Sequence, residues 1–67
     1  MTTVYTVLTP AKDIRTGDRV HLWEQDWRVL AAETYRRRTK LVLHRGDLPP
    51  LEMSFKPTRE IEREEMA

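Results

Sequence analysis

The sequence predicts an all-β domain, a small barrel of five or six short strands, and three observations predict it. Apolar and β-branched residues alternate with polar ones in short runs, which is the period of a strand. Turn residues such as Thr16-Gly17-Asp18 and Gly46–Pro50 separate these runs. With 67 residues the chain has room for one domain, residues 1–67, of which we expect 64–67 to fray.

The first strand is predicted over Thr2–Leu8, where β-branched and aromatic residues dominate. Its alternation buries either the even-numbered or the odd-numbered side chains. Thr9-Pro10 ends this strand, because proline donates no hydrogen bond to a neighbouring strand. The segment Ala11–Ile14 is too short for a stable helix. We expect Ile14 to enter the core from a single turn.

A β-hairpin that carries both tryptophans is predicted over Thr16–Leu30. Even-numbered apolar residues of its first strand must share a face with odd-numbered residues of its second strand, so the loop needs an even number of residues. Both Glu24-Gln25 and Gln25-Asp26 satisfy this condition. The second loop places Trp23 opposite Arg28 on the outer surface, a cation beside an aromatic ring. The core residues predicted here are Val20, Leu22, Trp27, Val29 and Ala31.

Two further strands follow. Thr39–His44 places Leu41 and Leu43 in the core, and pairing them with odd-numbered residues of the preceding strand predicts a three-residue loop, Arg36–Arg38. After a turn with two prolines, Leu51–Phe55 alternates as a half-buried strand.

The acidic end of the chain allows two readings. Thr58 could cap a helix over 59–63, but a helix with Ile61 as its single apolar residue is poorly anchored. As a strand, the same segment forms a charged edge that closes the sheet against an early strand. The strand is the favoured reading.

Composition limits the function. Hydrophobic residues make up 39% and charged residues 34% of the chain, and there is no cysteine for a disulfide or a cysteine-built zinc site. His21 and His44 alone do not complete a metal site, so no metal is expected. No apolar stretch approaches the roughly 20 residues that cross a bilayer, and no leader is apparent, so we expect a cytoplasmic protein without a membrane partner.

Catalysis is not expected. Ser54 is the only serine and lacks a nucleophile context, and two glycines, Gly17 and Gly46, do not form a phosphate-binding loop. A barrel of this size also offers no deep cleft in which to desolvate and tune a pair of carboxylates. We therefore expect a non-enzymatic interaction module that needs no cofactor.

A short motif resembles a known family. Residues 13–20, Asp-Ile-Arg-Thr-Gly-Asp-Arg-Val, followed by 27–30, Trp-Arg-Val-Leu, are similar to the opening of small barrels of the Src-homology-three type, including the first barrel of translation elongation factor P. The resemblance covers about Asp13–Leu43 and implies the barrel architecture. Elongation factor P carries a modified lysine on the loop between its corresponding strands. Here that loop, 35–38, has no lysine at its tip, so the family's function does not transfer.

The candidate site is the run of three arginines at a hairpin tip, with further cations and aromatic residues on nearby strands. Guanidinium groups bind phosphates, and aromatic rings stack on unpaired bases. Residues 1–45 hold nine basic and five acidic residues, whereas 46–67 hold three and six, so the basic charge gathers at the front of the chain. The predicted nucleic-acid-binding residues are Arg36, Arg37, Arg38, Lys40, Arg28, Arg45, Tyr35 and Trp23.

Three alternatives to a nucleic-acid site stay open. The arginines could form a solvated loop whose charges face the acidic residues of 60–65. They could bind an acidic protein. The domain could also associate with a protein or with itself through an outer apolar stripe of Trp23, Leu30 and Val42.

Overall fold

The computed structural model describes residues 3–66, which form six strands and one short 3-10 helix. The elements are β1 (Val4–Pro10), η1 (Ala11–Asp13), β2 (Arg19–Leu22), β3 (Gln25–Tyr35), β4 (Arg38–His44), β5 (Leu51–Phe55) and β6 (Glu60–Met66). Thr2, predicted to begin the first strand, lies outside the described residues. No helix within residues 3–66 has the length and apolar character to cross a bilayer.

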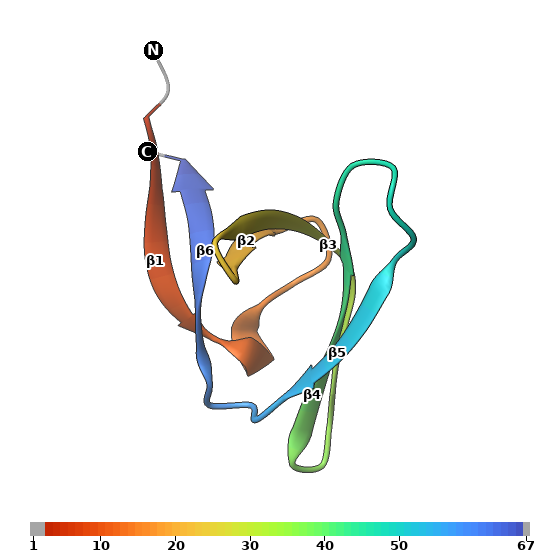
Figure 1. The fold of residues 1–67 in the computed structure, drawn as a ribbon. Helices are drawn as coiled ribbons and strands as arrows, with labels where there is room; N and C mark the ends of the chain where they lie inside the picture. The colour runs from red at the N-terminus through yellow and green to blue at the C-terminus, as the bar shows by residue number, and fades with distance from the viewer. Residues whose placement is uncertain (1–2, 67) are drawn as a thin grey trace.

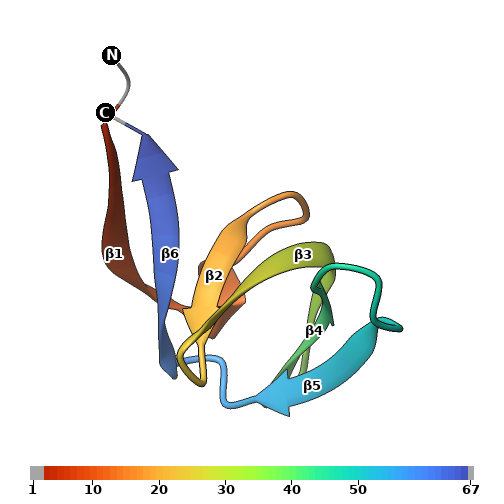
Figure 2. The ribbon, with the colours of Figure 1, turned by 45° about the horizontal axis from the view of Figure 1, so that its top comes forward.

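Every neighbouring strand pair is antiparallel, and the order across the sheet is β1-β6-β2-β3-β4-β5. The sheet bends strongly, so that β1 and β6 stand on one side of the molecule and β4 and β5 on the other (Figures 1 and 2). The all-β prediction is confirmed with six strands. Among residues 3–66, the strand pairs leave β1 and β5 as the two edges of the sheet, and no pair joins β1 to β5. The described strand pairs therefore establish a bent sheet with two edges.

The hairpin of β2 and β3 has a two-residue loop, as parity predicts, but the loop is Trp23-Glu24. Leu22 pairs with Gln25 and Val20 with Trp27. Both loop residues have positive φ, 52° and 62°, as a type I′ turn requires to match the twist of the strands. The predicted loops at 24–25 and 25–26 are therefore wrong in position, and Trp23 sits in the turn, not on a strand opposite Arg28.

A β-bulge in β3 changes which residues face the core. Val29 pairs with Leu43 and Ala31 with Val42, so Leu30 is the extra residue. Beyond it, even-numbered residues turn inward. Ala32 packs against the core, whereas Ala31, predicted to be buried, is exposed. The bulge lies within a run of four apolar residues, 29–32. Because this run contains no polar residue, the alternation of polar and apolar residues could not reveal the shift.

The core draws residues from β2 to β6 and from the connection after β1. Ile14 follows η1 and is 3% exposed, as expected of a residue that enters from a single turn. Trp27 packs against the core but is only partly buried. The buried hydrophobic residues are Ala11, Ile14, Val20, Leu22, Val29, Leu41, Leu43, Phe55 and Ile61.

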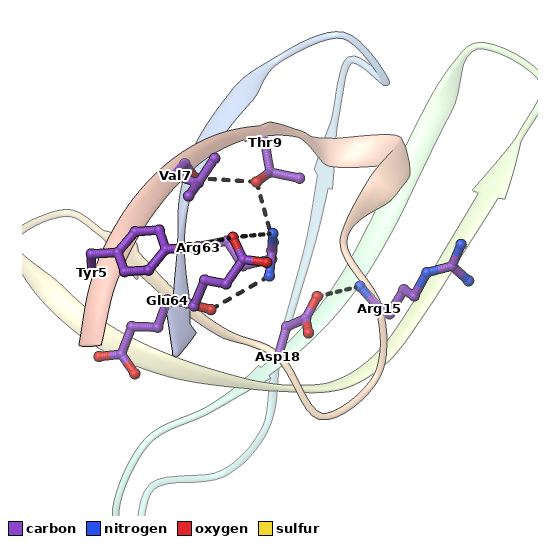
Figure 3. A network of polar contacts seen from close by, with 8 residues as sticks. Tyr5, Val7, Thr9, Arg15, Asp18, Arg63 and Glu64 are labelled. Atoms are coloured by element: carbon purple, nitrogen blue, oxygen red, sulfur yellow. Dashed lines mark hydrogen bonds and ion pairs between the residues drawn. The ribbon is translucent and has the colours of Figure 1, made fainter. Parts of the chain in front are cut away.

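The turn before β2 is fastened to β3. The Asp18 carboxylate accepts a hydrogen bond from the backbone N–H of Arg15 at 2.8 Å (Figure 3), and Gly17 takes a φ of 94°, which L side chains rarely adopt. The Gly17 N–H donates to the Val29 carbonyl, and the Val29 N–H donates to the Asp18 carbonyl. The motif that suggested a family resemblance thus forms a tight corner.

The acidic segment is a strand, as favoured from the sequence, and not a helix. It does not form an edge, because β6 lies between β1 and β2 in the sheet. Ile61 is its core residue, at 1% exposure. β6 also continues past Arg63, where the pattern placed its end, and pairs along β1 as far as Met66.

Candidate functional site

The arginine tip lies at the end of the hairpin formed by β4 and β3, and β3 is the longest of the described strands, at 11 residues. Tyr35 pairs with Arg38, so the loop holds two residues, Arg36 and Arg37, and Arg36 has a φ of 55°. The predicted three-residue loop, Arg36–Arg38, is wrong because the bulge at Leu30 reverses the parity of the strand that leads into it.

Arg38 is a strand residue tied to the neighbouring strand β5. Its Nε donates to Ser54 Oγ at 3.0 Å, and its Nη2 donates to the Ser54 carbonyl at 3.1 Å. These two bonds hold the guanidinium over the outer face of β4 and β5. Arg38 therefore supplies a positioned charge, whereas Arg36 and Arg37 project from the loop.

Tyr35 adds an aromatic surface to the tip. Its side chain is 65% exposed, and the guanidinium carbon of Arg36 lies 5.4 Å from the centre of its ring. This is cation–π distance. A flat base could stack on the same ring, and the arginine beside it could bind the adjoining phosphate.

The tip residues border an open hollow of about 780 Å³ on the outer face of the sheet. Its charged lining is four cations and a single carboxylate, that of Glu33. Lys40 also forms an ion pair with Glu52, with its Nζ 3.5 Å from the carboxylate oxygen. Five of the eight predicted site residues meet here. The lining residues are Glu33, Tyr35, Arg36, Arg37, Arg38, Lys40 and Ser54.

The other three predicted residues lie at the opposite end of β3 and β4. Arg28 pairs with His44 of β4 on one side and with Arg19 of β2 on the other, so three basic side chains stand in a row across three strands. Like charges directly opposite one another destabilise a sheet unless a counter-charge is near. Arg45 places its guanidinium carbon 6.0 Å from the Trp27 ring.

Trp23 packs against the second tryptophan, not against Arg28 as predicted. The two indole rings meet edge to face with their centres 6.0 Å apart. Trp23 remains 49% exposed, and it lies seven positions before Leu30 along the chain, with Glu24 and the first half of β3 between them. The predicted outer stripe is therefore divided: Leu30 lies at the bulge beside Val42, and Trp23 lies at the far end of β3.

Sequence reasoning missed Arg19, His44 and Ser54. Arg19 and His44 share the outward parity of Arg28, which a correct register would have revealed. Ser54 was recognised only as a poor nucleophile, and no local signal indicates that it anchors Arg38.

The acidic residues of 60–65 do not neutralise the tip, contrary to one reading of the sequence. They lie on β6, which β2 separates from β3 in the sheet. Glu64 pairs with His21 and Glu65 with Arg63. Among residues 3–66, Arg36 and Arg37 have no carboxylate within ion-pair distance.

His21 lies between two carboxylates on the outer face of β2. Its Nδ1 contacts Asp26, and its Nε2 is 3.2 Å from Glu64. The three candidate ligand atoms lie within 4.8 Å of one another. The two carboxylates approach opposite nitrogens of the imidazole ring and do not gather beside one nitrogen, as ligands around a single ion would.

Comparisons with protein families, with curated proteins and with solved structures find no match for this chain. The resemblance of residues 13–43 to small barrels of the Src-homology-three type therefore stays a prediction from the sequence.

Proposed function

We propose that this protein is a non-enzymatic module that binds single-stranded nucleic acid along the outer face of β3 and β4. The observation that carries the proposal is the pair of loop arginines, Arg36 and Arg37, which lack a carboxylate partner within residues 3–66 and border a basic hollow beside an exposed tyrosine. Such cations are free to replace the counterions of a phosphate backbone.

The arrangement of the outer face supports an extended ligand. β4 spans about 20 Å from Arg38 to His44, at roughly 3.3 Å per residue. Basic residues stand at both ends of this span, the tip group at one end and Arg28 with His44 at the other. A track of this length suits roughly four nucleotides, the lower end of the site sizes of small single-strand-binding domains.

The scaffold is part of the proposal. We propose that the bent sheet is a barrel of the Src-homology-three type. Two features support this. The motif of 13–20 forms a tight corner fastened to β3, and η1 donates backbone hydrogen bonds to Arg59 and Pro57, which links the segment after β1 to the connection between β5 and β6. In such a barrel the outer face of β3 and β4 is open to a ligand.

The test is the salt dependence of binding to a labelled 12-nucleotide single strand, followed by fluorescence anisotropy. Replacing Arg36 and Arg37 by Ser removes two phosphate contacts. The slope of log affinity against log salt should then fall by roughly 1.4, at about 0.7 per contact on single strands. The melting temperature should fall by a few degrees at most. Neither arginine has a carboxylate partner within residues 3–66, and the contact of Arg36 with the Tyr35 ring is an exposed one, worth about 0.5 to 1 kcal/mol.

The matched control is Lys12→Ser with Arg15→Ser, which removes the same charge from exposed positions. Lys12 and Arg15 border a different hollow, beside Ala32 and Thr34, on the inward side of β3. This pair should leave the slope close to that of the wild type. Equal slopes for both double variants would show that only net charge matters and would remove the tip from the site. If the wild type did not bind the single strand even at low salt, the proposal would be wrong and a protein partner would be favoured.

A further inference from the structure

The edge strand β1 is the least protected part of the sheet. Over Val4–Pro10 it carries no charged residue, and its one proline is the last residue. An edge strand exposes a row of unpaired backbone N–H and C=O groups, and proteins usually block such an edge with charges, prolines or bulges. None of these devices interrupts residues 4–9.

The opposite edge, β5, is protected in the usual way. Glu52 places a charge within its five residues, and prolines stand on both sides of it, at Pro50 and Pro57. Arg38 also bonds to Ser54 within this strand. The two edge strands of the sheet thus differ: β5 carries features that block further pairing, and β1 does not. This difference singles out β1 as the edge that is available to another strand.

The outer side of β1 exposes apolar side chains that the fold does not cover. Val4 is 53% and Leu8 60% exposed, and Met66, which pairs with Val4 from β6, is 71% exposed. On the inner side, polar contacts fix the strand in place (Figure 3). Arg63 Nε donates to Thr9 Oγ1 at 3.2 Å, and the Tyr5 hydroxyl donates to Glu65 at 3.5 Å. β1 is therefore held in place along β6, while its other edge stays free.

We propose that β1 pairs with β1 of a second copy of this chain, antiparallel and centred on Thr6, to form a symmetric dimer with a continuous twelve-stranded sheet. The occupant follows from self-complementarity. In this register Thr6 lies opposite Thr6 of the other copy, and Val4 lies opposite Leu8, so the exposed apolar side chains cover each other in both directions. Tyr5 lies opposite Val7 on the inner side.

Charge and geometry agree with this register. Because β1 is uncharged, no charged side chain meets a like charge in the new strand pair. Pro10 falls outside the paired residues 4–8, so it removes no hydrogen bond. Aromatic with β-branched and threonine with threonine are favourable cross-strand pairs. In the sheet, β6 and β2 lie between β1 and the strands β3 and β4 that carry the basic track, so the dimer edge and the proposed nucleic-acid site use different strands.

A single pair of five-residue strands buries little surface. Stable complexes bury at least about 1,200 Å² in total. We therefore expect a dimer that dissociates in the micromolar range. Sedimentation equilibrium of the full chain should show a mass that rises from monomer to dimer with concentration.

The first variant is Leu8→Lys, which places a charge on the exposed edge without disturbing the core. It should weaken dimerisation at least tenfold. Leu48→Lys is the matched control, since Leu48 is 52% exposed in the β4–β5 connection, and it should dimerise as the wild type does. Circular dichroism melts establish that both variants fold. A wild type that stays monomeric at millimolar concentration, or equal dimerisation of the two variants, would overturn the proposal.

A crosslinking experiment tests the register. The chain has no cysteine, so Thr6→Cys introduces one thiol, which faces its own copy at cross-strand distance and should form a disulfide-linked dimer readily under mild oxidation. Val4→Cys is the control, because residue 4 lies opposite residue 8 and its own copy is about 13 Å away along the strand. It should crosslink much more slowly. Crosslinking of Val4→Cys at the same rate or faster would contradict the pairing.

Discussion

Trp27 stabilises the hairpin of β2 and β3 from within, through one hydrogen bond and one ring contact. Its indole Nε1 donates to the Leu22 carbonyl at 3.1 Å, and its ring meets Trp23 edge to face. Because Trp27 is partly buried, Trp27→Ala should lower the free energy of unfolding by about 2 to 3 kcal/mol, less than the roughly 3 to 5 typical of a fully buried ring. Trp27→Phe, which loses the donor, should cost about 1 kcal/mol.

Urea unfolding followed by circular dichroism measures both changes. Trp23→Phe is the control, because the Nε1 of Trp23 makes no hydrogen bond within residues 3–66 and its ring is half exposed. It should change the stability by less than about 0.5 kcal/mol. A larger loss at Trp23 than at Trp27 would show that the turn, and not the partly buried ring, stabilises the hairpin.

The three arginines of the tip are not equivalent at the residue scale. Arg38 is positioned by Ser54, Arg36 lies over Tyr35, and Arg37 makes neither contact. A positioned guanidinium loses less conformational freedom on binding than a free one. Within the proposed site, Arg38 therefore holds a phosphate in a fixed position, while Arg36 and Arg37 supply most of the mobile positive charge.

At the scale of elements, the turn Trp23-Glu24 holds residues of the wrong type for its geometry. Both have positive φ, which favours glycine or asparagine. Glu24→Gly should therefore raise the free energy of unfolding by about 0.5 to 1 kcal/mol, by removing strain at a φ of 62°.

The control for this prediction is Glu33→Gly, in the interior of β3 opposite Lys40. Glycine in the interior of a regular strand is destabilising, so the free energy of unfolding of this variant should be lower by about 1 kcal/mol. Thermal melts of the two variants should move in opposite directions. If Glu24→Gly melted below the wild type, the side chain of Glu24 would have a stabilising contact that outweighs the strain of its backbone.

The bulge in β3 has consequences beyond its own position. It turns Ala32 and Thr34 toward the core side, where Thr34 Oγ1 lies 3.0 Å from Oγ1 of the buried Thr39. It thereby shortens the loop to two residues and makes Arg38 a strand residue within reach of Ser54. One extra residue thus decides how the basic tip is built.

At the scale of the whole molecule, the core joins strands that lie far apart in the sequence. Ile61 is 1% exposed and brings β6 into a cluster with Leu41 of β4 and Phe55 of β5. A chain of this length has a small stability margin. Ile61→Ala should therefore cost about 2 to 5 kcal/mol and leave much of the protein unfolded at 37 °C.

Ile61→Val keeps most of the side chain and should cost about 0.5 to 1.5 kcal/mol. Leu48→Ala, on the exposed β4–β5 connection, should be within about 0.5 kcal/mol of the wild type. Denaturant titration measures all three. A cooperative transition for Ile61→Ala at the wild-type midpoint would mean that β6 does not contribute to the core.

The sequence by itself determined the elements and their inward residues wherever polar and apolar residues alternate. The all-β class, the turn at Gly17, the burial of Leu41 and Leu43, and the strand around Ile61 all follow from local patterns, because side-chain direction in a strand depends only on position. The positive charge of the 36–38 tip also follows directly from the sequence, because three arginines are adjacent there.

Tertiary structure alone decided the rest. The bulge at Leu30 lies in an apolar run without a polar marker, so only the pairing of β3 with β4 fixes it, and with it the loop length. The insertion of β6 between β1 and β2 depends on contacts between residues more than 40 positions apart. It separates the acidic strand from the arginines and leaves β1 as a free edge, since strand order follows from the packing of the whole core and not from any single segment.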